Sequence, residues 1–449
     1  MIDFIKIAYN KEYLELAEAF VPGISKDEEE VFIERAGDYL KLKTPTFEDQ
    51  VNLDSYFSYE KTNIKRGIYK LFKKYTNRDL AWGILVGVNP LKLVKKLLDS
   101  YAKDQVEKIL AEGYFLDRDK IDLAFEIIKK QEPFVKDLRD QAHIYIDIPF
   151  CPSKCSYCAY PTYLMEPEKI KLYTASLIKE IETFFSQTQM DFATVYIGGG
   201  TPSALGSENL DRLIKILRKY VRNIKEFTVE IGRPDTFDKD LLLMLKENKV
   251  DRISINPQSM NDKTLERIGR KHSALDIEKS FKLARDLGFY NINMDLIIGL
   301  PGEGALDFER SLNKVLDLGA DSISIHSLAL KKSSRLSQRG YENDRDLDFE
   351  KVRNTLMKTS VYEPYYLYRQ KHIYLNLENI GYSRIGKECL YNIAMMEDLG
   401  PVIGFGLGAT SKLILDKKIK RHMNPRTLKD YLAGSKESAL NKIKFLGSE

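Results

Sequence analysis

The chain has 449 residues, of which 43% are hydrophobic and 30% are charged, as is usual for a globular protein. Its net charge of +4 is too small to indicate nucleic acid as a partner, and no apolar run reaches the roughly 18 residues needed to span a membrane. The N-terminus lacks the basic and apolar segments of a secretory signal, so we expect a cytoplasmic protein.

Residues 1–140 have mostly helical patterns. Apolar residues recur at spacings of three and four over 92–109 and 121–128. Between 82 and 90 lies a short apolar run that contains the only tryptophan, Trp82, and ends in a turn at Pro90. These patterns predict an N-terminal, mostly helical domain.

Six strands alternate with helices over residues 141–330. We expect the strands at 143–150, 193–197, 227–231, 252–255, 290–298 and 322–328, and the helices at 169–185, 210–221, 239–247, 274–287 and 306–318. This alternation predicts an α/β fold in which a parallel sheet curls into a partial (β/α)6 barrel. Active sites of such barrels lie at the C-terminal ends of the strands. Residues 331–449 form a different block, a C-terminal α/β extension with an aromatic patch at 362–368 and a glycine-rich run at 404–408.

Three of the four cysteines, Cys151, Cys155 and Cys158, lie within eight residues after the first barrel strand. A disulfide framework would spread them along the chain, so the cluster indicates metal ligands. Three thiolates can hold three irons of a [4Fe–4S] cluster and leave the fourth iron open for a cofactor or substrate. Zinc is the main alternative, but it requires a fourth ligand, and His143 is poorly placed to provide one.

The segment IYIDIPFCPSKCSYC at residues 144–158 resembles the radical S-adenosylmethionine (radical SAM) signature. Its form is typical of oxygen-independent coproporphyrinogen III oxidases and their relatives. In that superfamily, the methionine part of SAM binds the open iron, and an electron from the cluster cleaves SAM to methionine and a 5′-deoxyadenosyl radical. The resemblance implies that Cys151, Cys155 and Cys158 hold the cluster and that Tyr157 flanks the adenine.

Other candidate cofactor-binding residues follow the strands. A bare glycine run such as 198–200 is also typical of a tight turn, and a carboxylate at a strand end can be an ion-pair partner. Asp295 is more telling, because an apolar strand rarely buries an aspartate without a partner. The resemblance assigns Gly200, Thr201 and Arg270 to the methionine part of SAM, Gln258 and Asp295 to its ribose, and Ala329 to the adenine pocket. It also suggests a second SAM held by Tyr145, Gly199 and Glu230.

The match is strongest to the HemZ-type branch of this family, which shares the element at 82–90 and C-terminal blocks such as 364–371 and 377–382. This resemblance implies oxidative decarboxylation of two coproporphyrinogen III propionates to vinyls, giving protoporphyrinogen IX in haem biosynthesis. A reducing electron donor such as a flavodoxin or ferredoxin is implied as a partner. Candidate contacts for the anionic tetrapyrrole are Tyr365, Tyr368, Arg369 and Lys371, although each also suits an amphipathic surface stretch.

Two other functions share the motif. Haem chaperones of the HemW type keep the radical SAM cysteines but deliver haem, and they carry an HNxxYW motif near the glycine-rich run. The corresponding residues 391–396 lack its histidine and its Tyr-Trp pair, which counts against this function but leaves haem binding open. His372, Cys389, Met395 and Met396 could still ligate haem iron. Radical SAM haem-degrading methyltransferases share the barrel and are not distinguished by motif.

Overall fold

The computed structural model describes residues 2–4, 11–21, 24, 32–44, 46–87, 89–331, 333–338, 341, 348–358, 360–370, 373–415 and 418–447. The chain forms two compact units. The first comprises Met1–Lys130, Ser327–Lys331 and Leu367–Asn379, and the second Gln131–His326, Lys332–Tyr366 and Ile380–Glu449. The division into domains 1–140, 141–330 and 331–449 stays a prediction, since the units also group segments that are distant in sequence.

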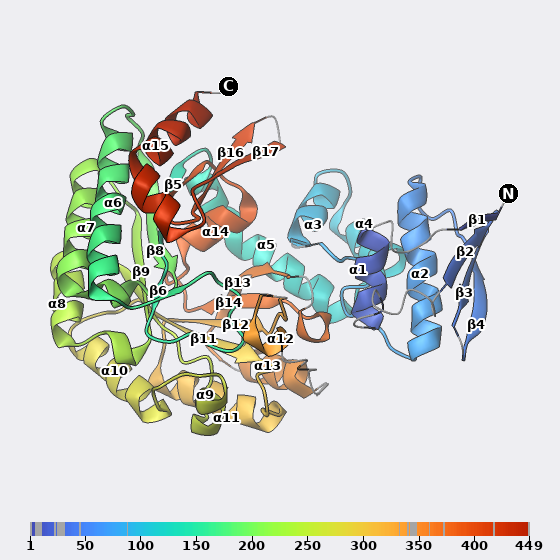
Figure 1. Ribbon diagram of the computed structural model, residues 1–449. Helices are drawn as coiled ribbons and strands as arrows, with labels where there is room; N and C mark the ends of the chain where they lie inside the picture. Colours follow the sequence, from blue (N-terminus) through green and yellow to red (C-terminus); the bar gives the residue numbers. More distant parts are fainter. Residues whose placement is uncertain are drawn as a thin grey trace. The chain divides into compact units, whose positions relative to one another are not determined.

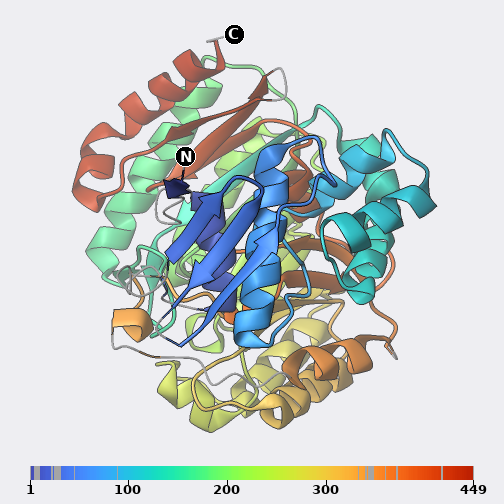
Figure 2. The same ribbon diagram turned by 90° about the vertical axis from the view of Figure 1, so that its right-hand side faces the viewer.

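The first unit contains a four-stranded antiparallel sheet, which the helical prediction for residues 1–140 did not include. Its strands lie in the order β1 (Ile2–Phe4), β2 (Phe32–Ala36), β3 (Tyr39–Lys43) and β4 (Glu48–Asn52). Helix α2 (Glu60–Thr76) packs on β3 and β4, and α1 (Lys11–Phe20) packs on α2 (Figure 2). Helix α1 buries Tyr13, Leu16, Ala17 and Phe20, which share one helical face. Helices α3 (Leu91–Leu98), α4 (Lys103–Lys108) and α5 (Arg118–Leu138) follow.

The second unit is built on an eleven-stranded sheet in the order β13-β14-β12-β11-β10-β9-β8-β5-β15-β16-β17. The six predicted barrel strands are β5 (Ala142–Ile148), β8 (Phe192–Gly199), β9 (Glu226–Gly232), β10 (Arg252–Ile255), β11 (Ile292–Ile298) and β12 (Ser322–Ser327). Helices α6 (Pro167–Phe185), α7 (Gly206–Tyr220), α8 (Lys239–Glu247), α9 (Asp262–Arg267), α10 (Ala274–Asp286) and α11 (Ala305–Leu318) lie outside the curled sheet (Figure 1). The predicted partial (β/α)6 barrel is therefore confirmed.

Side chains alternate between the two faces of the sheet along β5. In β5, Ile144, Ile146 and Ile148 are fully buried on one face, while Tyr145 and Asp147 point to the other. Strand register places polar residues of the neighbouring strands in line with these two, including Tyr196, Thr228, Glu230, Ser254 and Asn293. The inner face of this barrel is therefore polar. A typical closed barrel is instead filled with branched apolar side chains.

The C-terminal extension borders the barrel on both edges. Strands β13 (Glu363–Tyr368) and β14 (Asn379–Ser383) continue the sheet beyond β12. In sequence, α12 (Arg335–Gln338) and α13 (Asp348–Lys358) lie between β12 and β13. On the other edge, β15 (Val402–Gly406) runs parallel to β5 and is followed by the antiparallel strands β16 (Thr410–Leu415) and β17 (Lys418–Met423). Helix α14 (Leu390–Glu397) precedes β15 in the chain, and α15 (Leu428–Leu446) ends it. Extending the sheet on both sides leaves none of the six barrel strands at an edge.

A buried polar cluster fixes the last helix to the barrel. Glu180 of α6 accepts a hydrogen bond of 2.6 Å from Tyr431 and forms an ion pair with Lys442, both of α15. Glu180 and Lys442 are completely buried. No helix in the described ranges is both long and apolar enough to cross a membrane.

Candidate functional site

Cys151, Cys155 and Cys158 lie on one loop that follows β5. Cys151 ends the short strand β6 (Phe150–Cys151), which pairs with β7 (Tyr163–Leu164) on the far side of the loop. All three thiols are free, and all three line a single pocket of about 210 Å³. Burial raises the pKa of the Cys151 thiol to about 11, and it raises that of Cys158 as well. These thiols are therefore neutral unless a metal ion displaces their protons.

Residues from five barrel strands, or from the segments that follow them, line the same pocket. From the sequence prediction these are Cys151, Cys155, Tyr157, Cys158, Gly199, Gly200, Thr201, Glu230, Gln258, Arg270 and Asp295. They lie towards the C-terminal ends of the parallel strands, where active sites of such barrels are found. The roles that the resemblance gives to each of them stay predictions.

The glycine run after β8 lets the cysteine loop approach the barrel. A Cβ atom on Gly199, which has a φ of +110°, would lie 2.8 Å from the carbonyl oxygen of Ile148. A Cβ on Gly200 would lie 2.8 Å from the carbonyl oxygen of Phe150 and 3.0 Å from Cys151 Sγ. Thr201 then places its hydroxyl 3.4 Å from the same sulfur. The glycines are needed here because the loop backbone occupies the space that side chains would take.

The pocket wall carries polar atoms that have no partner among the described residues. They are the side-chain oxygens of Asn256 and Gln258 and Nε of Arg270. These three side chains are at most 9% exposed. Because buried polar groups are normally hydrogen-bonded, the wall fits a polar ligand. The guanidinium of Arg270 already reaches the backbone carbonyl of Asn256 and, at 3.4 Å, the hydroxyl of Tyr157.

Two carboxyl groups in the pocket are held in different states. Burial raises the pKa of Glu230 to about 7, and Glu230 accepts a hydrogen bond from the Tyr196 hydroxyl. Burial also acts on Asp295, but its contacts with His326 and Asn293 lower its pKa overall. Asn293 Nδ2 donates to Asp295 at 2.7 Å, and His326 Nε2 lies 3.8 Å from the carboxylate. Asp295 thus has protein partners that the sequence prediction did not identify, and it stays charged where Glu230 is largely neutral below pH 7.

Tyr145 does not line the pocket. Its ring stacks with those of Tyr196 and Tyr391, at centroid separations of 6.3 and 6.2 Å, and its hydroxyl lies 3.5 Å from that of Tyr160. Two of the residues assigned to a second SAM, Tyr145 and Glu230, thus already contact neighbouring tyrosines. A second SAM stays a prediction.

Three predicted contact residues outside the barrel, Ala329, Tyr365 and Arg369, do not line the pocket. Ala329 belongs to the first unit, where it forms a β-bridge with Ile373. Arg369, 3% exposed, donates hydrogen bonds to the Leu85 carbonyl and to Asn376. Tyr365 is fully buried. These contacts favour structural roles for Arg369 and Tyr365 over tetrapyrrole contacts.

Other residues were candidates for contacts with a tetrapyrrole or with haem iron, and the structure describes some of them. Lys371 and His372 lie outside the described residues. Cys389 is buried and donates to Glu226 at 3.4 Å. The sulfur of Met395 lies 3.5 Å from Lys412 Nζ.

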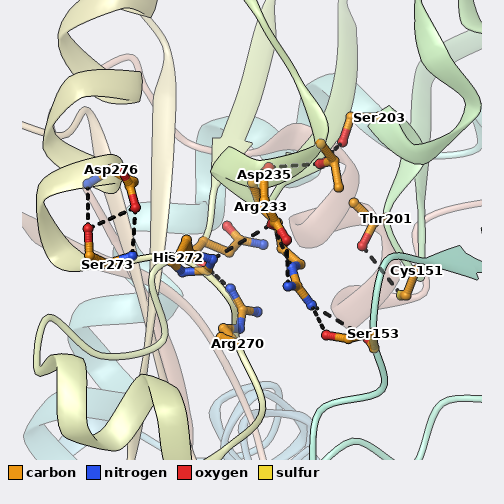
Figure 3. Close-up of polar contacts among 12 residues, drawn as sticks. Cys151, Ser153, Thr201, Ser203, Arg233, Asp235, Arg270, His272, Ser273 and Asp276 are labelled. Carbon is orange, nitrogen blue, oxygen red and sulfur yellow. Dashed lines mark hydrogen bonds and ion pairs between the residues drawn. The ribbon is translucent and has the colours of Figure 1, made fainter.

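The sequence prediction missed one residue that lines the pocket, Arg233, and one buried carboxyl group behind Gly199, Asp147. Arg233 follows β9, lines the pocket and bonds to Ser153 of the cysteine loop (Figure 3). Asp147 is 3% exposed and accepts a hydrogen bond from Tyr160, and burial raises its pKa to about 7. An aspartate inside an apolar strand was the signal that singled out Asp295, and the same signal could have identified Asp147.

The lining of the pocket suits an iron–sulfur cluster better than a zinc ion. No group of three His, Cys, Asp or Glu side chains in the described ranges is arranged to hold a single metal ion. A single zinc ion would need its ligands converging at about 2.0–2.3 Å. Three separate thiols around one pocket instead fit a cluster in which each binds a different iron.

Comparison with known proteins gives consistent results. The Radical SAM superfamily profile matches residues 145–315. The chain is 39% identical over 412 residues to the oxygen-independent coproporphyrinogen-III oxidase-like protein HemZ of Bacillus subtilis, covering 87% of this chain and 82% of that protein. It is 33% identical over 272 residues to the heme chaperone HemW of the same organism, covering 59% and 69%. Among solved structures, coproporphyrinogen III oxidase (HemN) of Escherichia coli matches with a TM-score of 0.56 at 22% identity, covering 69% of this chain and 73% of that one, which supports the fold alone.

Proposed function

We propose that this chain, which belongs to the radical SAM superfamily and within it to the HemZ-like family, cleaves SAM reductively and uses that chemistry on a tetrapyrrole. The cofactors of the superfamily are a [4Fe–4S] cluster and SAM. The observation that carries the proposal is the convergence on one pocket, at the strand ends, of three free thiols and of buried polar atoms that have no hydrogen-bond partner among the described residues.

In this proposal Cys151, Cys155 and Cys158 hold three irons of the cluster. When bound, the cluster supplies the electron that cleaves SAM to methionine and a 5′-deoxyadenosyl radical. Gly200 and Thr201 border the methionine part, and the Arg270 guanidinium binds its carboxylate. Gln258 and Asp295 bind the ribose hydroxyls, which accounts for the unpartnered oxygen of Gln258. A flavodoxin or ferredoxin serves as the electron donor.

The proposed reaction is oxidative decarboxylation of coproporphyrinogen III. Each of two propionates would lose a hydrogen atom from its β-carbon to the 5′-deoxyadenosyl group that bound SAM would supply. The bond to the carboxylate carbon would then break, and CO₂ would depart. One electron per propionate passes to a one-electron acceptor, and a vinyl group remains. The share of the protein is to position the substrate and exclude water, because the cofactor carries the difficult step. The match to HemZ supports this substrate class, since it extends over most of the chain and well beyond the barrel.

A direct test incubates the reconstituted protein anaerobically with coproporphyrinogen III, SAM and dithionite, and analyses the products by mass spectrometry. We expect 5′-deoxyadenosine together with loss of two CO₂ per tetrapyrrole. The Cys155→Ala protein is the matched control and should give neither product. Formation of 5′-deoxyadenosine without decarboxylation would contradict the substrate assignment but not SAM cleavage.

A second candidate function is haem binding and transfer. The 33% identity to HemW supports it, and the absence of the HNxxYW residues from 391–396 weighs against it. Tight, stoichiometric haem binding with an unchanged tetrapyrrole in the same incubation would favour this function. A ring-opened, methylated product would favour the haem-degrading methyltransferase instead.

A further inference from the structure

Arg233 lies directly behind the cysteine loop. It follows β9 in the turn Gly232-Arg233-Pro234-Asp235, and its side chain is 3% exposed. Its guanidinium forms a forked ion pair with Asp235, with Nε and Nη2 at 2.9 and 2.7 Å from the two carboxylate oxygens. This geometry fixes the plane of the guanidinium and leaves Nη1 pointing towards the loop (Figure 3).

Ser153 accepts a hydrogen bond from Nη1, the third nitrogen of this guanidinium. Arg233 Nη1 donates to Ser153 Oγ at 2.8 Å, and Ser153 Oγ in turn donates to the carbonyl oxygen of Gly269 at 2.9 Å. Ser153 stands between Cys151 and Cys155. A single hydroxyl therefore joins the cysteine loop to the turn after β9 and to the turn after α9. Nearby, the backbone N–H of Ser156 donates to the carbonyl of Ile268, so the loop has a second anchor on the same turn.

The ion pair is also oriented with respect to the pocket. Its positive end lines the pocket together with the three cysteines, whereas Asp235 does not line it and is 24% exposed. An arginine keeps its charge at every physiological pH, so this charge does not depend on conditions. A cluster held by three thiolates concentrates negative charge, which increases by one unit when the cluster is reduced. A fixed positive charge at this place favours the reduced state.

We propose that Arg233, held by Asp235, is a positioning residue that fixes the cysteine loop through Ser153 and stabilises the reduced cluster by its charge. The proposal rests on the proposed function, because it assumes that the loop holds a cluster. The plain alternative is that Arg233 and Asp235 form a structural ion pair that only stabilises the fold.

Loop positioning is tested on the metal-free protein by hydrogen–deuterium exchange. We expect the amides of the loop 151–158 to exchange about tenfold faster in Ser153→Ala and Arg233→Gln, the order of effect of losing one or two hydrogen bonds. Arg252→Lys is the matched control. Arg252 is also a buried arginine bonded to a serine, with Nη2 at 2.6 Å from Ser322 Oγ, but it lies at the start of β10 and does not line the pocket. This control should leave exchange in the loop unchanged.

The charge effect is tested on the reconstituted protein by redox titration, followed by the electron paramagnetic resonance signal of the reduced cluster. At a fixed potential near the wild-type midpoint, the ratio of reduced to oxidised cluster should be roughly threefold to tenfold lower in Arg233→Gln than in wild type. Arg233→Lys keeps a charge without the fork, so it should remain close to the wild-type ratio. Ser153→Ala keeps the charge and should also retain that ratio, although its loop exchanges faster.

The results separate the proposal from its alternative. Wild-type exchange in the loop of both Ser153→Ala and Arg233→Gln, with only a lower melting temperature, would overturn positioning. Equal reduced fractions in Arg233→Gln and Arg233→Lys would overturn the charge effect. If wild-type protein binds no cluster, the proposed function fails, while the exchange experiment still decides whether Arg233 positions the loop.

Discussion

Trp82 donates a hydrogen bond of 2.7 Å from its indole Nε1 to Oε2 of Glu378, across 296 residues of sequence. Lys120 Nζ lies 2.8 Å from the other oxygen of the same carboxylate. All three side chains are at most 2% exposed and belong to the first unit. Two segments far apart in the sequence, 82–90 and 377–382, thus meet through Trp82 and Glu378 in one buried polar cluster.

Removal of the Glu378 carboxylate should strongly destabilise the first unit. Glu378→Ala leaves the Lys120 ammonium buried without this partner, which typically costs about 3–5 kcal/mol. Chemical denaturation followed by tryptophan fluorescence measures the effect, because Trp82 is the only tryptophan and lies in the cluster. The matched control is Asp49→Ala, which breaks the exposed ion pair with Lys74 and should cost at most about 1 kcal/mol. Equal costs for both variants would contradict the assignment.

Cluster content should depend on the three clustered cysteines and not on the fourth. Cys155→Ala should lose most of the iron and sulfide that anaerobic reconstitution introduces, because one of three protein ligands is missing. Cys389→Ala is the matched control, since this buried thiol contacts Glu226 instead of the pocket. We expect about four irons per chain in wild type and in Cys389→Ala. Iron analysis that finds wild-type content in Cys155→Ala would refute the ligand assignment.

Arg270 should matter for SAM affinity through the shape of its side chain as well as its charge. Arg270→Lys keeps the charge but loses the planar fork, so we expect SAM binding to the reconstituted protein to weaken about tenfold to hundredfold. Equilibrium dialysis with labelled SAM measures this change. Arg267→Lys is the control, because Arg267 is exposed at the end of α9, shortly before Arg270 in the chain, and bonds to the Gly302 carbonyl. An affinity loss of the same size in Arg267→Lys would argue against a specific contact.

Asp147 should make stability depend on pH. Burial raises its pKa from 3.8 to about 7, so the folded chain binds a proton here that the unfolded chain has released. The stabilisation is fully present below pH 3.8 and is lost as the pH rises to about 7, by at most about 1.4 kcal/mol per pH unit. Asp147→Asn cannot titrate and should flatten the decline between pH 4 and 7. Thermal melts of wild type and of Asp147→Asn across this pH range measure the effect. If stability changes with pH by the same slope in both proteins, the prediction is wrong.

Much of the barrel and its site could be predicted because the signals are local. The apolar residues Ile144, Ile146 and Ile148 alternate with Tyr145 and Asp147 in sequence, and a strand puts them on opposite faces. Strand ends of a parallel sheet meet at one edge, so residues that follow different strands could be expected to share a pocket. The four-stranded sheet of the first unit was not predicted, since its strands are only three to five residues long, too short for an alternating pattern to stand out in the sequence.

The sequence by itself determined the cysteine spacing, the order of strands and helices in the barrel, and the polar residues at the strand ends, because each depends on neighbours along the chain. Only the tertiary structure decided which distant groups meet. Arg233 reaches Ser153 across 80 residues and Trp82 reaches Glu378 across 296, and no local pattern encodes either contact. Such contacts depend on strand register and on how loops close over the barrel, and these are set by the packing of the whole chain.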